Sequence, residues 1–204
     1  MATTTLNVDD MKSKLIGGGA RPNLFKVIPT WPSEVPHPTG DTASFMIKMA
    51  SLPGSTIANI EVPFRGRKLQ VAGDRTFDPW SITVINDNDF KIRNAFESWM
   101  GKMNDHVENT GEMNPARYYS TFTVIQLDKQ GDEIRTYEIH GIFPTSLSPI
   151  ELDYGAESTI EEFTVEFQVQ YWTNDKSTPK VGGNVKGNPY KRRQIGADGT
   201  MGGF

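Results

Sequence analysis

Hydrophobic and polar residues alternate along several short stretches of the chain, and this alternation predicts a protein built mainly of β-strands. Shorter alternating or apolar stretches predict strands at residues 23–29, 43–49, 80–84, 119–127 and 134–142. In the second of these, Phe45, Ile47 and Met49 are expected on one face. The strongest alternation comes late, where hydrophobic positions 163, 165, 167, 169 and 171 are separated by Thr164, Glu166, Gln168 and Gln170.

One segment has a helical period instead. Ile92, Phe96, Trp99 and Met103 are spaced so that they form a single apolar stripe on a helix from Phe90 to about Met103. We expect this stripe to pack on a sheet. The polar cluster at residues 86–89 (Asn-Asp-Asn-Asp) precedes the helix and is typical of an N-cap.

Two turns are predicted between strands. Residues 128–132 contain a glycine and predict a hairpin turn. Residues 57–71 predict a second hairpin or a long excursion, with Gly66 near its turn. The tip of this excursion is basic, because it carries Arg65, Arg67 and Lys68.

Both ends of the chain differ from its centre. Residues 6–16 predict a short helix, which three consecutive glycines then end. Residues 173–204 are rich in glycine and poor in large apolar groups, so they predict an extended or disordered arm. We therefore divide the chain into an N-terminal helix and hinge arm (1–20), a β-barrel domain (21–172) and a C-terminal extended arm (173–204). The predicted fold is mainly β with minor helix: an antiparallel β-sandwich or barrel with one flanking helix.

Composition excludes several classes of protein. The formal net charge of −4 argues against a general nucleic-acid binder, which is normally basic. The chain has no cysteine, so neither disulfides nor thiolate chemistry are available. The first residues do not form a signal peptide, and no apolar run approaches the ~18 residues of a membrane helix, so we expect no membrane anchor.

Charge is distributed unevenly along the sequence. Residues 130–175 contain ten acidic residues and one basic residue, whereas residues 176–204 contain six basic residues and one acidic residue. Two interpretations stay open. The acidic region is a solvated face with a solubilising tail, or acidic strands of one copy meet the basic tip and arm of another. Open sheet edges, which a ring of subunits can close, are compatible with the second interpretation.

No catalytic or metal-binding pattern is found. The three histidines, His37, His106 and His140, lack any second ligand at a metal spacing. No Gly-x-Ser-x-Gly motif marks a nucleophile, and the glycine run at 17–19 lacks the rest of a phosphate-binding loop. Asp87–Asp89 lacks the glycine and distal glutamate of a calcium loop. We therefore expect no enzymatic activity, no cofactor and no metal.

Four blocks of sequence, taken in order, resemble a known family. They are RPNLFKVIP from Arg21, ASLPGSTIANIEVPFRGRKLQVAGDRTFDPWSITVINDND from Ala50, the following FKIRNAFESWM, and PIELDYGAESTIEEFTVEFQVQYW from Pro149. Together they are similar to the tail tube proteins of T4-like phages, over roughly residues 15 to 172. The order of the blocks makes the resemblance specific, and the arm after Trp172 extends beyond it.

The resemblance implies an assembly as well as a fold. Members of this family form hexameric rings that stack into the inner tube of a contractile tail, with a sheath around it, and DNA passes through the channel into the host. The implied partners are other copies of the chain, the tail sheath protein, the baseplate and tail terminator proteins, and DNA transiently in the lumen without specific binding. The implied location is the virion tail, assembled in the host bacterial cytoplasm.

The resemblance also implies roles for particular residues. The excursion from Leu52 to Val71 reaches the neighbouring ring, so its basic tip contacts acidic groups such as Glu151 and Asp153. The helix stripe packs on the sheet. Glu166, Gln168 and Gln170 face either the lumen or the outer wall; because duplex DNA is densely charged, a neutral or acidic lumen would let it slide.

Other functions stay open at this point. Two alternatives share the same architecture: a tube protein of type VI secretion (the hemolysin-coregulated protein) and a baseplate tube initiator. An alternative from a different class is a monomeric β-sandwich module that binds carbohydrate through Trp80, Tyr171 or Trp172. Exposure of these aromatic residues in a cleft would favour the carbohydrate-binding module, and their burial would favour the tube subunit. A hydrolase with a dispersed triad is the last alternative.

Overall fold

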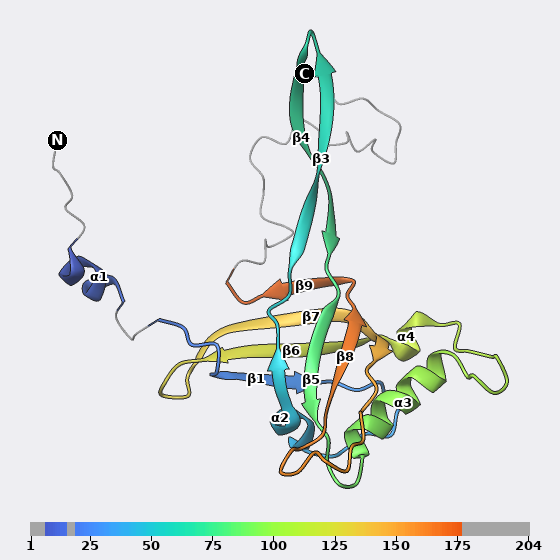
Figure 1. Cartoon of the computed structure of the whole chain (residues 1–204). Coiled ribbons are helices and arrows are strands. Elements are labelled where there is room, and N and C mark those ends of the chain that lie inside the picture. The colour runs from blue at the N-terminus through green and yellow to red at the C-terminus, as the bar shows by residue number, and fades with distance from the viewer. Residues whose placement is uncertain (1–6, 16–18, 177–204) are drawn as a thin grey trace, which may run out of the picture.

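A computed structural model describes residues 7–15 and 19–176 of the chain. Within these ranges nine strands and four helices form (Figure 1). The strands are β1 (Phe25–Pro29), β2 (Ile47–Ala50), β3 (Ser55–Phe64), β4 (Arg67–Phe77), β5 (Trp80–Ile85), β6 (Ser120–Leu127), β7 (Glu133–Leu147), β8 (Glu162–Gln168) and β9 (Tyr171–Asn174). The helices are α1 (Val8–Lys14), α2 (Thr42–Met46), α3 (Lys91–Met103) and α4 (Pro115–Tyr118).

Seven strands make one antiparallel sheet that folds over into a sandwich. The order along the sheet is β1-β6-β7-β8-β5-β2, and β9 also pairs with β7. The long strand β7 belongs to both halves, since its first part pairs with β6 and β9 and its last part pairs with β8. In Figure 1 the strands of the half β7-β8-β5-β2 cross those of the half β1-β6-β7-β9, which is the arrangement of an orthogonal sandwich.

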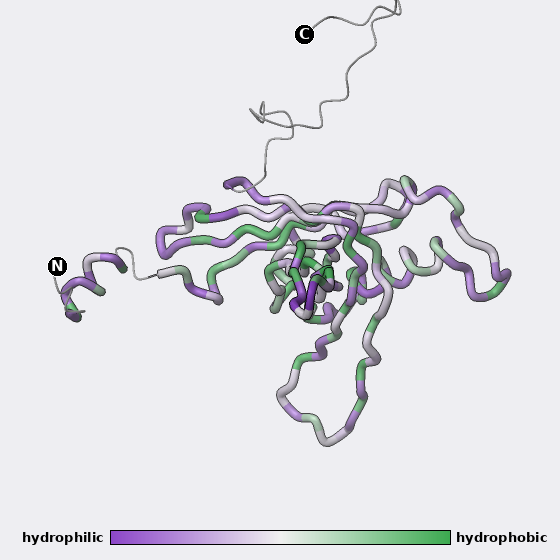
Figure 2. The backbone as a smooth tube through the Cα atoms, turned by 90° about the horizontal axis from the view of Figure 1, so that it is seen from above, coloured by the Kyte–Doolittle hydropathy of each residue, from purple (hydrophilic) through white to green (hydrophobic). Residues whose placement is uncertain are grey.

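The core lies between the two halves and is closed by α3. Alternate residues of β5, β6 and β8 point inward, and the largest fully buried side chains are aromatic: Trp80, Trp99, Phe96, Phe122, Phe163 and Phe167. Seen along the β3–β4 direction, hydrophobic stretches run through the central strands, the turns at the left and right are mostly hydrophilic, and the loop at the bottom mixes hydrophilic and hydrophobic residues (Figure 2). A strand that is buried on one face alternates in this way because successive side chains point to opposite faces.

The apolar stripe of α3 occupies the predicted position. Ile92, Phe96 and Trp99 are at most 1% exposed, and Met103 packs at the edge of the core. The Phe96 ring lies 5.8 Å from that of Phe167, in the β8 half, and the Trp99 ring 6.3 Å from that of Phe122, in the β6 half. The helix therefore joins the two halves of the sandwich.

The predicted N-cap of this helix is wrong. The N-cap residue is Phe90, which has a left-handed backbone (φ 54°), and no side chain caps the helix. Asp89 instead pairs with Lys91, and this hydrogen bond holds the pKa of Asp89 below its ordinary value. Asn86 donates from Nδ2 to Glu161 at 2.9 Å, so the polar cluster fastens the loop before β8.

The predicted strand at residues 43–49 is also wrong. Thr42–Met46 form the helix α2, and only Ile47–Ala50 form a strand. Ile47 is buried, whereas Phe45 is 79% and Met49 60% exposed, so these three residues do not share a buried face. A short apolar run does not distinguish a short helix from a strand by its periodicity, and the packing of neighbouring elements determines which of the two forms.

The remaining predictions differ from the structure mainly at element boundaries. The predicted N-terminal helix is shorter, at Val8–Lys14, and none of its residues is buried. The strand predicted at 134–142 extends to Leu147. The late strand divides at residues 169–170 into β8 and β9, and β9 continues past Trp172 to Asn174. Most of the predicted C-terminal arm lies outside the described residues. Among the residues that the structure describes, no helix is long and apolar enough to cross a membrane.

Candidate assembly surfaces

Strands β3 and β4 form a two-stranded hairpin that rises from one end of the sandwich (Figure 1). Its turn consists of Arg65 and Gly66, which both have positive φ (46° and 82°) as in a two-residue type I′ turn. Asparagine and glycine suit such a turn, whereas an arginine there costs about 1–2 kcal/mol of backbone free energy. The hairpin was predicted from the sequence at 57–71, but it is longer at both ends.

The two faces of this hairpin differ in chemistry. On one face, Lys68 and Gln70 hydrogen-bond to Glu61, and Asn59 hydrogen-bonds to Gln70. The hydrogen bond from Lys68, followed by that from Gln70, lowers the pKa of Glu61. The opposite face is apolar and exposed, with exposed fractions between 44% and 68%: Ile60, Val62, Phe64, Leu69 and Val71. We call this second set the apolar hairpin face.

The apolar hairpin face exposes a continuous hydrophobic surface, which is unusual for a protein that remains a monomer. The register places Ile60 opposite Val71 and Val62 opposite Leu69, so the apolar side chains form one continuous surface. A two-stranded hairpin is at best marginally stable in water by itself. A contiguous exposed apolar surface typically marks an interaction site.

The basic residues at the tip are not equivalent. Lys68 already pairs with Glu61 inside the hairpin. The Arg65 guanidinium lies over the Phe64 ring, 5.5 Å from its centroid, and it makes no ion pair within the described residues. Arg67 likewise has no ion pair in the described part of the chain, so Arg65 and Arg67 carry the charge available to a partner.

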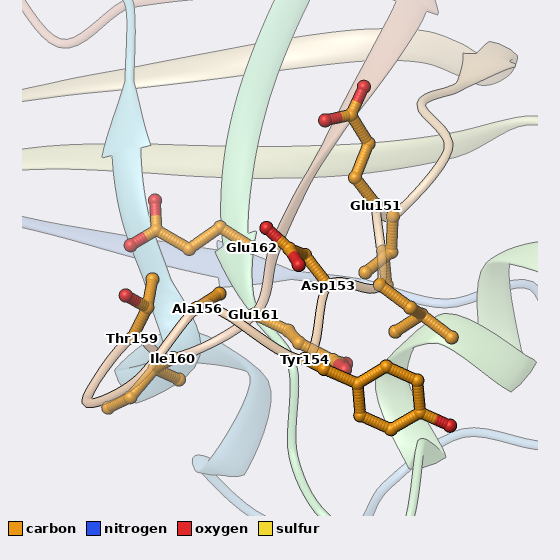
Figure 3. A pocket seen from close by; sticks show the side chains of 10 residues that line it. Glu151, Asp153, Tyr154, Ala156, Thr159, Ile160, Glu161 and Glu162 are labelled. Carbon is orange, nitrogen blue, oxygen red and sulfur yellow. The ribbon is translucent and has the colours of Figure 1, made fainter.

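The loop between β7 and β8 carries the acidic candidates. Glu151 and Asp153 line an open hollow in this loop together with Glu161 and Glu162 (Figure 3). Three large apolar residues beside them are strongly exposed: Leu152 (83%), Tyr154 (fully) and Ile160 (65%). In Figure 3 the Tyr154 ring extends away from the carboxylates of Glu151 and Glu162. We call residues 150–162 the acidic loop; it offers negative charge and apolar contact together.

The hairpin and the acidic loop lie at opposite ends of the sandwich. Strands β5 and β8 are antiparallel, with Trp80 opposite Phe167 and Ile85 opposite Glu162. The hairpin joins β5 just before Trp80, whereas the acidic loop joins β8 at Glu162. Figure 1 shows the hairpin above the sandwich and the loop at its lower edge. The structure thus separates Arg65 and Arg67 from Glu151 and Asp153 within one subunit, and a contact between them requires two copies.

The outward face of the β7-β8-β5-β2 half carries mostly small polar side chains, and at its β2 edge it also carries the exposed Met49, opposite Thr83, and Lys48, which pairs with Glu162. Glu166 lies between Ser81 and Ser146 across the three strands, and Thr83 faces Thr164, with their hydroxyl oxygens 3.4 Å apart. Glu166 and Gln168 both point away from the core on this face. Gln170 differs, because it lies beyond β8 and donates from Nε2 to the Tyr119 hydroxyl at 3.2 Å.

The remaining candidates do not form a ligand site. Trp80 is 1% exposed, and the partly buried Trp172 uses its indole nitrogen inside the subunit. Tyr171 is 49% exposed and stacks on His140. The aromatic residues of the carbohydrate-binding hypothesis therefore do not line a common cleft. The described residues contain no cluster of histidine and acidic side chains that fits a metal ion.

These features define a class of protein: a β-sandwich subunit with a basic, partly apolar hairpin at one end and an acidic, partly apolar loop at the other, as is typical of subunits that self-assemble. A model of the phage tail tube protein family matches residues 20–175, and the chain belongs to this family. It is 33% identical over 167 residues to the tail tube protein gp19 of Enterobacteria phage T4, covering 81% of this chain and 98% of gp19.

Solved structures share the fold. A chain of the anti-feeding prophage baseplate superposes with a TM-score of 0.59 at 15% identity, covering 76% of this chain and 95% of that one. A chain of the sheath–tube complex of the extracellular contractile injection system PVC superposes with a TM-score of 0.54 at 12% identity, covering 83% and 98%. The predicted antiparallel β-sandwich of the tail tube type is confirmed.

Proposed function

We propose that the chain is the structural subunit of the inner tail tube of a contractile-tailed phage, and that its hexameric rings stack into a channel for DNA. The observation that carries the proposal is the position of the basic hairpin tip and the acidic loop at opposite ends of one sandwich. Identical copies in the same orientation bring the two surfaces together at every ring boundary. Such a heterologous contact does not close on itself, so it generates a filament.

The contact between rings has a charged part and an apolar part. Arg65 and Arg67 of one ring pair with Glu151 and Asp153 of the next, while Lys68 keeps the hairpin in shape through Glu61. The apolar hairpin face is covered by apolar groups of the neighbouring ring, such as Leu152 and Ile160. Burial supplies most of the affinity, and the charges supply orientation and specificity.

Strand direction supports closure of each ring. Within the described residues, β2 and the last part of β7 each have one edge without a strand partner. Because the four strands β7, β8, β5 and β2 alternate in direction, β2 of one copy runs antiparallel to β7 of the next copy in a ring. Edge pairing would then continue the antiparallel sheet around the ring and close both of these edges.

The polar outward face of this four-strand half is the proposed lumen wall. Serine, threonine and glutamine side chains offer no fixed positive charge, Glu166 adds negative charge, and the lysine at the β2 edge, Lys48, is neutralised by its ion pair with Glu162. A wall of this kind does not neutralise phosphates, so DNA passes without being held. Glu166 and Gln168 are assigned to the lumen, whereas Gln170, beside Tyr119, is not.

The proposed partners and location follow from the same assembly. The outer wall meets the sheath, and the two ends of the tube meet the baseplate and the tail terminator. Assembly takes place in the host cytoplasm before the virion is released. The division into an N-terminal arm (1–20), a barrel domain (21–172) and a C-terminal arm (173–204) is retained as part of the proposal.

Electron microscopy of the purified chain tests the proposal. Six-fold rings and long tubes are expected. The double variant Arg65→Glu/Arg67→Glu should leave folded subunits that do not stack, and adding Glu151→Arg/Asp153→Arg to the same chain should restore tubes. Lys129→Glu, an exposed charge reversal in the β6–β7 turn, is the control and should stack normally. A chain that stays monomeric at high concentration would refute the tube, and normal tubes from the double variant would refute the charged contact.

A further inference from the structure

The hairpin is joined to the sandwich through a short segment, Ser51–Gly54, which follows β2 and precedes β3. Two indole groups bind this segment. Trp80 Nε1 donates to the Ser51 carbonyl oxygen at 2.6 Å, and Trp172 Nε1 donates to the Gly54 carbonyl oxygen at 3.0 Å. The two bonds hold the first and last residues of the segment.

The two tryptophans come from different halves of the sandwich. Trp80 begins β5, is 1% exposed and packs on Phe167, with ring centroids 5.5 Å apart. Trp172 lies in β9, which pairs with β7, and its ring contacts that of Tyr137 at 5.8 Å. Each ring is therefore fixed by its own strand. A donor on a fixed ring sets both the position and the direction of the carbonyl that it binds.

The segment itself is suited to being held. Pro53 restricts the backbone in its middle. Gly54 lies close to the side chain of Asp78, in the connection between β4 and β5, because a Cβ at this position would lie 2.7 Å from a carboxylate oxygen of Asp78. The first hairpin pair, Ser55 with Phe77, follows directly, and Phe77 packs at the edge of the core.

We infer that Trp80 and Trp172 form a clamp that fixes the direction of the hairpin relative to the sandwich before rings meet. This inference rests on the proposed stacking, in which the tip must reach an acidic loop at a defined place. A hairpin that swings about its root would lose entropy on docking, and a preset direction removes that cost. Trp172 is a positioning residue here, since it acts on the tip only through the root.

The substitution Trp172→Phe tests the clamp, because phenylalanine keeps an aromatic ring against Tyr137 but lacks the N–H donor. Amide exchange at Ser55 and Phe77 should become about 5- to 10-fold faster, the effect of losing one net hydrogen bond. Spin labels at Leu69→Cys and Ser98→Cys, in a chain that otherwise has no cysteine, should give a broader distance distribution. Trp80→Phe should act in the same direction.

Two controls separate positioning from general stability. Trp99→Phe also removes an indole donor, to the Tyr118 carbonyl at 2.8 Å, but far from the hairpin root. It should lower the melting temperature without broadening the distribution. Tyr171→Phe, next to Trp172, should change neither the amide exchange at the hairpin root nor the distance distribution.

The outcome that overturns the clamp is a Trp172→Phe variant with unchanged root exchange and an unchanged distance distribution. Broadening in Trp99→Phe equal to that in Trp172→Phe would overturn it as well. Both measurements use subunits diluted below the concentration at which tubes form, so they do not depend on tube formation. Failure of the unsubstituted chain to form tubes would instead count against the proposed function.

Discussion

The apolar hairpin face gives a quantitative test of stacking. Val62 and Leu69 are paired across the hairpin and are 44% and 61% exposed in the subunit. Full burial of such a side chain is worth about 1.5–3 kcal/mol, so covering the exposed half of each contributes roughly 1 kcal/mol. Val62→Ser/Leu69→Ser should therefore weaken stacking by about 2 kcal/mol per subunit, which raises the critical concentration for tube growth roughly 30-fold.

The critical concentration is measured by pelleting tubes from a dilution series. The matched control is Asn59→Ser/Ala72→Ser, a pair on the polar face of the same hairpin, which should change the critical concentration little. Neither double variant touches the sandwich core, so both should melt within a few degrees of the unsubstituted protein. An unchanged critical concentration for Val62→Ser/Leu69→Ser, or an equal rise in the control, would show that this face is not buried between rings.

Four further outcomes are expected. Phe96→Ala, a truncation in the core between α3 and both halves of the sheet, should cost about 3–5 kcal/mol and lower the melting temperature by roughly 10 °C in calorimetry, whereas Ser98→Ala on the exposed side should not. Arg65→Asn should slow amide exchange in the hairpin, because asparagine suits the left-handed turn, and yet raise the critical concentration, because a tip charge is lost. Tube growth in the unsubstituted chain should weaken from low salt to about 1 M salt, since exposed charge pairs are screened, but the neutral-tip variant Arg65→Gln/Arg67→Gln should lose this dependence. The pKa of Glu34 is lowered by its hydrogen bond from Lys102, and the pKa of Glu112 is lowered by hydrogen bonds from the Asn114 amide and Arg117. A carboxyl group whose pKa is depressed in the folded state stabilises that state above its ordinary pKa of 4.5, and this stabilisation is lost as the pH falls. The midpoint of denaturation should therefore be constant above about pH 5 and fall below pH 4.5, and the fall should be smaller in Glu34→Gln.

Periodicity correctly predicted the elements that bury only one of their faces. The alternation in β8 and the stripe on α3 arise because each element buries a single face, so the sequence alone reveals which residues are inside. The same rule fails for residues 43–49, where a short helix passes directly into an edge strand and Phe45 is left exposed. It also fails at residues 86–89, because asparagine and aspartate serve tertiary contacts as readily as caps.

The assembly surfaces were harder to predict from the sequence. The basic tip was visible as a cluster of charges, but the pairing of Lys68 with Glu61 depends on cross-strand register, which is set by the turn at Arg65 and Gly66. The apolar hairpin face was missed, although Ile60, Val62 and Phe64 alternate with polar neighbours. Alternation reports that one side of a strand is apolar, and it does not report whether the partner of that side belongs to the same chain.

The separation of the two surfaces has a consequence for the ends of the proposed tube. In the proposed tube, each ring boundary would bury one layer of hairpins and one layer of acidic loops, so a finished tube would leave hairpins at one end and acidic loops at the other. A protein that ends the tube on the hairpin side must offer carboxylates and an apolar surface, as the acidic loop does. One that binds the other end must offer a basic, apolar projection. The stacking contact cannot limit its own length, because each added ring presents the same surface again. If the proposed stacking is right, tube length has to be set by a partner and not by this chain, and the purified chain should form tubes of widely varying length.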